Sequence, residues 1–134
     1  MLNQSGVKTV SGTTRKTILV DEKNSTALSC MVANTGVSAV DGKKIVKAGT
    51  PLAGSLEARN IAFTVAKDTA SGEPSVTTSD AVGLLLHDVD VTNGTANAQV
   101  LIFGIVDVSK LESDVVSKLT AAAKANLKMI QFVK

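Results

Sequence analysis

Aromatic residues are nearly missing from this chain of 134 residues, which has three Phe and no Trp or Tyr. Proteins that bind single-stranded nucleic acid stack the bases on aromatic faces, and pockets for small molecules are commonly lined by aromatic side chains. The formal net charge of +2, with no block of Lys or Arg, is too small for a protein that follows a nucleic-acid backbone. The composition therefore argues against nucleic-acid, carbohydrate and small-molecule binding.

Cysteine and long apolar runs are also scarce. Cys30 is the only cysteine, so no disulfide can form within the chain, which fits assembly in a reducing cytosol. The first residues, MLNQSGVK, lack the apolar run of a signal peptide. No segment is long and apolar enough to cross a bilayer. We therefore expect synthesis in the cytoplasm and no membrane partner.

Groups for catalysis or metal binding are few. His87, Asp88 and Asp90 form the one cluster of potential ligands, but in an extended strand His87 points away from both carboxylates. Zinc needs three or four converging ligands, and two Asp would hold calcium only weakly. Cys30 with His87 is the one conceivable thiol–base pair, and a lone Cys in an apolar run is usually a small buried hydrophobe. We expect no enzyme, no catalytic or metal site and no cofactor, with a small metal protein or enzyme as an alternative.

The residues that are abundant favour a β-rich domain. Hydrophobic residues make up 44% of the chain and charged residues 19%, and Val, Ala, Thr and Ser are frequent, which favours strands. Residues 1–17 are rich in Ser and Thr, contain Gly6 and Gly12, and cannot bury enough surface to become ordered alone. They are either a frayed terminus or an arm that adds a strand to the sheet edge of a partner. The predicted organisation is an arm at 1–17 and one β-rich domain at 18–134.

Short strands separated by turns are expected in the first half of the domain. Strands are predicted at 16–20, 43–47 and 61–66, whereas 26–33 is a strand or a helical turn. Turns are predicted at Asn34-Thr35-Gly36, at Asp41-Gly42 and around Gly49-Thr50-Pro51. The polar segment 67–79 is expected to be a surface loop.

The clearest pattern is a hairpin within residues 80–108. Two apolar runs, Ala81–Leu86 and Val100–Val106, flank a polar loop that contains Asn93-Gly94. Alternation places Val100, Ile102 and Val106 on one face of the second strand, and Leu101, Phe103 and Ile105 on the other. A sheet with one wet face would alternate apolar and polar residues, so both faces must be covered, either by a second layer of this chain or by another subunit. Gly104 suggests a bulge or a close backbone approach. The candidate core or oligomer residues are Leu84, Leu86, Leu101, Phe103 and Ile105.

The last quarter of the chain completes the predicted fold. Apolar residues recur at helical spacing in 110–127, which predicts one helix, and 128–133 reads as a strand that returns to the sheet. The fold class expected from these patterns is mainly β with one C-terminal helix.

Four segments in this order resemble the lambda-type head decoration proteins of tailed phages and the related head fibre proteins. They are LysAlaGlyThrProLeu at 47–52, SerAspAlaValGly at 79–83 with the LeuLeuLeu and HisAspValAsp that follow, GlnValLeuIlePheGlyIleValAspValSerLysLeu at 99–111, and LysMetIleGlnPheVal at 128–133. The resemblance covers about two-thirds of the chain, and each motif alone is modest. Their ordered combination carries the likeness.

The resemblance implies a small β-tulip or barrel-like domain that decorates the outer surface of the expanded capsid in the virion and stabilises the head against internal DNA pressure. It implies a homo-oligomer, with a trimer favoured, and the major capsid protein as partner. An N-terminal arm would add a strand to that protein, and the turn Gly49, Thr50, Pro51 and Leu52 would lie near an interface. The base module of a head fibre or of a host-surface adhesion protein is the alternative. The candidate arm residues are Val7, Lys8, Val10, Arg15, Lys16 and Ile18.

Overall fold

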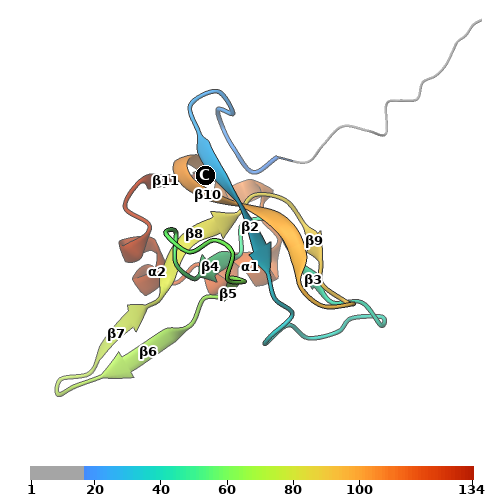
Figure 1. Cartoon of the computed structure of the whole chain (residues 1–134). Coiled ribbons are helices and arrows are strands. Elements are labelled where there is room, and N and C mark those ends of the chain that lie inside the picture. The colour runs from blue at the N-terminus through green and yellow to red at the C-terminus, as the bar shows by residue number, and fades with distance from the viewer. Residues whose placement is uncertain (1–16) are drawn as a thin grey trace, which may run out of the picture.

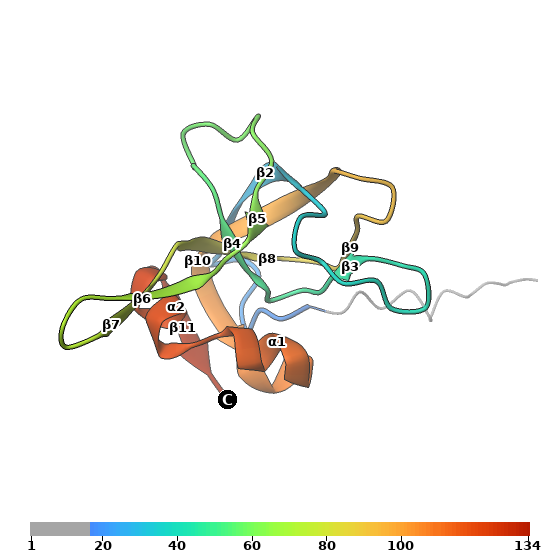
Figure 2. The same ribbon diagram turned by 90° about the horizontal axis from the view of Figure 1, so that it is seen from below.

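The computed structural model describes residues 17–134, and its body is a curved six-stranded sheet with helices packed on one side (Figures 1 and 2). The strands follow the order β11–β10–β8–β4–β5, and β2 also pairs with β10. Two small two-stranded sheets, β3–β9 and β6–β7, lie outside this path. The strands of the large sheet are β2 (Thr26–Val32), β4 (Pro51–Ala53), β5 (Thr64–Val65), β8 (Ala81–Leu85), β10 (Ala96–Asp107) and β11 (Ile130–Val133). The predicted mainly β class is confirmed.

The long strand β10 is the centre of the sheet. It pairs antiparallel with β2 and β8 and parallel with β11. The predicted pairing of the two apolar runs is confirmed, because Val100 lies opposite Leu85 and Leu101 opposite Leu84. The return of the chain to β11 is also confirmed, and its parallel direction requires a crossover, which the helical segment supplies.

The strands β2, β10, β8, β4 and β5, in this spatial order, curl into an incomplete barrel around a first core. Phe63, which precedes β5, forms a single bridge with Val32 of β2. The Phe63 N–H donates to the Met31 carbonyl at 2.7 Å, and the Ala33 N–H donates to the Phe63 carbonyl at 2.8 Å. Within residues 17–134 no continuous strand pair closes this side, so the sheet is barrel-like but open. The buried members of this first core are Cys30, Val32, Val46, Leu52, Phe63, Leu85, Val91 and Val100.

A second core lies between the other face of the sheet and the helices. Leu84 and Leu101 of the sheet pack there with Val115 and Leu119 of the helical segment. Because neighbouring residues of β8 and β10 enter different cores, both faces of the predicted hairpin are covered by layers of this chain where Leu84 and Leu85 pair with Leu101 and Val100. The buried members of this second core are Ile18, Leu19, Ala48, Ala81, Leu84, Leu86, Leu101, Val106, Leu111, Val115, Leu119, Ala123, Leu127 and Ile130.

The predicted single helix at 110–127 is divided. A 3₁₀ turn, η2 (Val108–Lys110), is followed by α1 (Ser113–Lys118) and α2 (Ala121–Asn126). Thr120 has extended backbone angles, and its hydroxyl accepts the Ala123 N–H at 3.1 Å. A Thr in this conformation caps a new helix start, so the apolar spacing continues across the break while the helix does not.

A register shift divides β10 into two parts with different facing. The shift lies between Leu101 and Phe103, and Gly104, with φ of 151°, follows it. Leu101 and Val106 therefore both face the helical core. The prediction that Leu101, Phe103 and Ile105 share one face is wrong, because the alternation does not anticipate the added residue. The expectation of a bulge or close approach at Gly104 is confirmed.

The segment 67–79, predicted to be a surface loop, contains a hairpin. Strands β6 (Asp68–Ser71) and β7 (Val76–Ser79) pair antiparallel and project from the body (Figures 1 and 2). At its base, the Asp80 carboxylate accepts the Lys67 N–H at 2.6 Å, and the Asp80 N–H donates to the Lys67 carbonyl at 3.2 Å. Every residue of β6 is exposed. Neither face of this polar, Thr-rich segment is apolar, so its sequence lacks the alternation that predicts a strand and indicates a loop instead.

Other predicted elements differ from the structure mainly in length. Residues 26–33 form strand rather than a helical turn, while the predicted strand 43–47 is reduced to β3 (Ile45–Val46), which pairs with β9 (Val89–Asp90). Of the predicted strand 16–20, Leu19 forms a bridge with Val106 of β10. The turn at Asp41-Gly42 is confirmed: both residues have positive φ, at 53° and 77°.

Replacing Phe63 by Ala should destabilise the domain strongly, because its fully buried ring is the largest side chain of the first core. A cavity of this kind costs about 3–5 kcal/mol. Ile61→Ala is the matched control, since Ile61 is 66% exposed two residues away and should change stability by less than about 0.5 kcal/mol. Urea unfolding followed by circular dichroism measures both, and equal effects would show that Phe63 does not support the barrel-like half.

Candidate interaction surface

The two carboxylates of the candidate metal cluster accept hydrogen bonds from backbone N–H groups. The Asp88 carboxylate accepts the Ala48 N–H at 2.7 Å. The Asp90 carboxylate accepts the Thr92 N–H at 2.9 Å and the Thr92 hydroxyl at 2.5 Å. Residues 17–134 contain no group of three or more His, Cys, Asp or Glu side chains placed to hold a metal ion. The cluster therefore ties the strand ends around β3 and β9 together.

The Cys30 thiol lies in the wall of the first core. It is buried within β2, and its burial raises the pKa of the thiol, an effect that the positive charge of Arg59 partly opposes. The Arg59 guanidinium is held nearby, donating to the Ser29 carbonyl at 2.8 Å. Because the thiolate is the reactive form, this environment favours an inert, structural cysteine.

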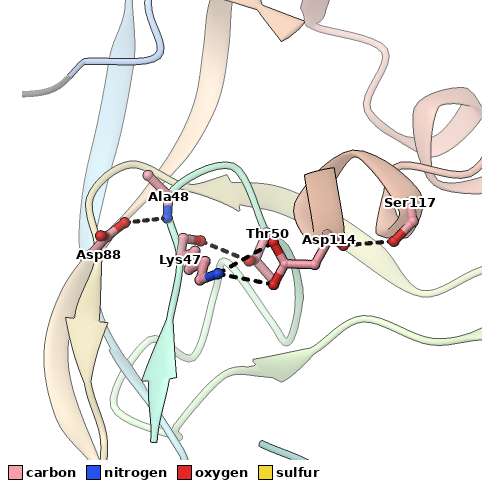
Figure 3. A network of polar contacts seen from close by, with 6 residues as sticks. All are labelled: Lys47, Ala48, Thr50, Asp88, Asp114 and Ser117. Atoms are coloured by element: carbon pink, nitrogen blue, oxygen red, sulfur yellow. Dashed lines mark hydrogen bonds and ion pairs between the residues drawn. The ribbon is translucent and has the colours of Figure 1, made fainter. Parts of the chain in front are cut away.

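Polar contacts lie where the turn 47–52 meets α1, as Figure 3 shows. The Lys47 ammonium lies 3.2 Å from the Asp114 carboxylate. Within the turn, the Thr50 hydroxyl donates to the Lys47 carbonyl at 2.7 Å. A Cβ on Gly49, which has φ of 91°, would meet the Leu111 side chain. The turn thus needs glycine where it passes beneath the helical segment.

The turn that was predicted to lie near an interface is in the interior of the domain. Gly49, Thr50, Pro51 and Leu52 are all buried, and the apolar side chains of Leu111 and Val115 lie against Gly49. The Gly-Thr-Pro bend was anticipated from sequence, but its burial follows from the packing of α1 over it.

The hairpin candidates separate into interior and surface residues. Leu84, Leu86 and Leu101 are buried in the second core, so they are core residues. Ile105 is partly buried, and Phe103 is 43% exposed. The register shift beside Phe103 turns it and Ile105 away from the helices.

Among the candidate arm residues, only Ile18 is within the described part of the chain. Val7, Lys8, Val10, Arg15 and Lys16 lie outside it. Ile18 is fully buried in the second core, and its carbonyl accepts the Asp107 N–H at 2.8 Å. Its assignment to a capsid-binding arm is therefore corrected, because the domain itself uses this side chain.

An exposed apolar surface lies on the side of the sheet opposite the helices, where the C-terminal half of β10 meets β11. We call it the apolar face and define it by its apolar members Val20, Phe103, Ile105, Met129 and Val133. Val20 is 54% exposed, Phe103 43%, Met129 62% and Val133 38%. The Val20 N–H donates to the Ile105 carbonyl at 2.9 Å, and Ile105 pairs with Gln131 of β11. Three adjacent chain segments therefore contribute to one surface.

A groove of about 420 Å³ borders the apolar face. Phe103 and Met129 lie in its wall, so it extends the same apolar surface. Its other lining residues are Thr26, Leu56, Val82, Ile102, Asn126, Leu127, Lys128 and Ile130.

Sequence reasoning found Phe103 and Ile105 but missed Val20, Met129 and Val133 as surface residues. The strand expected at 128–133 could have indicated Met129 and Val133, because successive side chains of a strand point to opposite faces and one set can be exposed. The direction of each face depends on the register with β10, and no local pattern gives this register. Val20 was missed because the strand predicted at 16–20 had no predicted pairing strand.

No protein-family model matches the chain, and no curated protein sequence matches it. No helix within residues 17–134 has the length and apolarity needed to cross a membrane. The apolar face is therefore interpreted from its own chemistry.

Replacing Asp88 by Ala should cost about 1–2 kcal/mol, because it leaves the partly buried Ala48 N–H without its charged acceptor. Asp114→Ala is the matched control. It removes the exposed partner of Lys47, and exposed ion pairs contribute little. Thermal unfolding at pH 7 ranks the two variants, and a larger loss for Asp114→Ala would contradict the proposed order.

Acid should destabilise the protein through Asp90 and Asp107. Hydrogen bonds from Thr92 and Ser109 lower the pKa of these carboxyls below their ordinary value of 3.8. Their contribution is therefore complete above the unfolded-state pKa and is lost as the pH falls through the lower folded-state pKa. The melting temperature should fall between about pH 5 and pH 2, and less steeply in an Asp90→Asn/Asp107→Asn variant. Equal slopes would contradict this role, and Asp68→Asn in the exposed hairpin is the control.

Proposed function

We propose that this chain is a non-enzymatic decoration protein that binds the outer surface of an expanded phage capsid and stabilises the head against internal DNA pressure. The observation that carries the proposal is the apolar face, which is exposed on a domain whose two cores are otherwise closed by its own layers. Exposed apolar patches mark interaction sites. The described chain also begins beside this face, since Leu19 bridges Val106 of β10.

The four segments of the resemblance support the proposal by their position. Each contributes to the second core: Ala48 from 47–52, Ala81 from 79–83, Leu101 and Val106 from 99–111, and Ile130 from 128–133. Segments separated by up to about 80 residues thus build one unit rather than four unrelated surface motifs. Since no family model and no curated sequence matches the chain, the resemblance rests on the four motifs and their order.

The proposed mechanism combines capsid binding by the N-terminal arm with avidity from oligomer formation. The arm at 1–17 adds a strand to an edge of the major capsid protein, which satisfies backbone groups with little demand on side chains. Ordering such a segment costs about 1–2 kcal/mol per residue in backbone entropy, so one arm binds weakly. An oligomer, for which the resemblance favours a trimer, adds avidity of about 10²–10⁴. Only the expanded lattice presents the required spacing.

The base module of a head fibre or host-surface adhesion protein is the second candidate. The observation in its favour is the β6–β7 hairpin, which projects from the body and is exposed along β6 (Figures 1 and 2). A hairpin of this kind suits contact with, or presentation of, a further component. Deleting the hairpin tip 72–75 should leave capsid binding intact under the decoration hypothesis.

Capsid binding should depend on the arm at 1–17, and substitutions in this arm should leave the fold unaffected. We expect the full chain to sediment with undecorated expanded capsids, and Val7→Asp/Val10→Asp to reduce the bound fraction at least about tenfold by removing strand-compatible apolar side chains. The control is Val76→Asp, an exposed apolar residue of the hairpin. Electron cryo-microscopy of the mixtures locates the protein. Normal decoration by the Val7→Asp/Val10→Asp variant would remove the arm from the mechanism.

A further inference from the structure

We propose that a second copy of this chain covers the apolar face, so that two sheets pack face to face about a two-fold axis that runs parallel to β10 and β11. The proposal names the partner of the surface on which the proposed function rests. It departs from the trimer that the resemblance favours, because a trimer joins two different patches, whereas this face is largely apolar and can pack against an identical surface.

The side chains of the face support pairing with an identical surface. Its members are apolar apart from the uncharged Gln131, which lies opposite Ile105 in the register. At the end of the face, the Asp107 carboxylate accepts the Ser109 N–H at 3.0 Å and the Ser109 hydroxyl at 2.6 Å. Asp107 is thus committed to the 3₁₀ turn. Two such faces can therefore pack about 10 Å apart without burying a carboxylate that lacks hydrogen-bond donors.

The two long margins of the face carry opposite charge, and this selects the axis. On one margin Asp21 and Glu22 follow Val20, with a single cation, Lys23, after them. On the other margin, Lys128 and Lys134 flank β11. A two-fold axis parallel to the strands places the acidic margin of each copy against the basic margin of the other. An axis across the strands would place like margins together, which is unfavourable.

Isologous contacts repeat each interaction twice, so single substitutions on the face act on both halves of the interface. Phe103 lies in β10, the middle segment of the three, and is the one aromatic side chain among the five apolar members. A large aromatic residue at the centre of an interface commonly dominates its binding energy. A carboxylate at this position would face the equivalent apolar surface of the second copy and leave a desolvated charge.

Sedimentation equilibrium of the full chain over a concentration series, without capsids, tests the proposal. We expect a mass twice that of the 13.7 kDa chain and at least about a tenfold higher dissociation constant for Phe103→Asp. Val76→Asp, on the projecting hairpin, should leave the dissociation constant unchanged. A monomer at all concentrations, a trimer, or a dimer insensitive to Phe103→Asp overturns the proposal. Circular dichroism confirms that Phe103→Asp remains folded, and Met129→Asp replaces it if it does not.

Charge reversal tests the axis separately. Glu22→Lys and Lys128→Glu should each raise the dissociation constant at low salt, and the double variant should restore it, because the exchanged charges again face each other. Additive weakening in the double variant overturns the axis parallel to the strands. Since these measurements contain no capsid, a failure here is distinct from a failure of capsid binding, which co-sedimentation measures independently.

Discussion

The structure depends on the pairing of β10 along both of its edges. Its 12 residues pair with β2 and β8, then with β11, while the segment that contains Leu19 bridges its last part. A strand placed in this way satisfies its backbone groups on both sides and leaves only its faces to be covered. At its centre, Val100 enters the incomplete barrel and Leu101 the helical core. Two adjacent apolar residues thus join the two halves of the domain.

The register shift in β10 leaves one face of its C-terminal part exposed, while the other face stays buried. Without it, Phe103 would continue the face of Leu101 and lie under the helices. With it, Val106 takes the helical side and Phe103 turns outward. The added residue is accommodated where Gly104 passes close to Leu19 and Ser25, whose side chains would lie 3.4 and 3.2 Å from a Cβ at this position. The apolar face therefore results from one local irregularity in the middle of an otherwise continuous apolar run.

The polar groups of the domain serve its architecture. Asp88, Asp90 and Asp107 accept backbone N–H groups, and Lys47 of the turn 47–52 forms an exposed ion pair with Asp114 of α1 (Figure 3). The features without such an architectural role lie on the surface: the apolar face, its bordering groove and the projecting hairpin. Under the proposed function, these elements contact the surface of another molecule, and affinity then depends on geometry and on the number of copies bound together.

Local sequence patterns were sufficient for the elements that depend on neighbouring residues. They predicted the mainly β class, the apolar runs 81–86 and 100–106, the turn at Asp41-Gly42 and the last strand, because apolar period, β-branched residues and turn dipeptides act over a few positions. Tertiary structure alone decided which side Phe103 faces, that Thr120 divides the helix, and that Ile18 and the turn at Gly49 are buried. These outcomes depend on register and packing between segments far apart in the chain, and a one-residue change of register reverses every face that follows it.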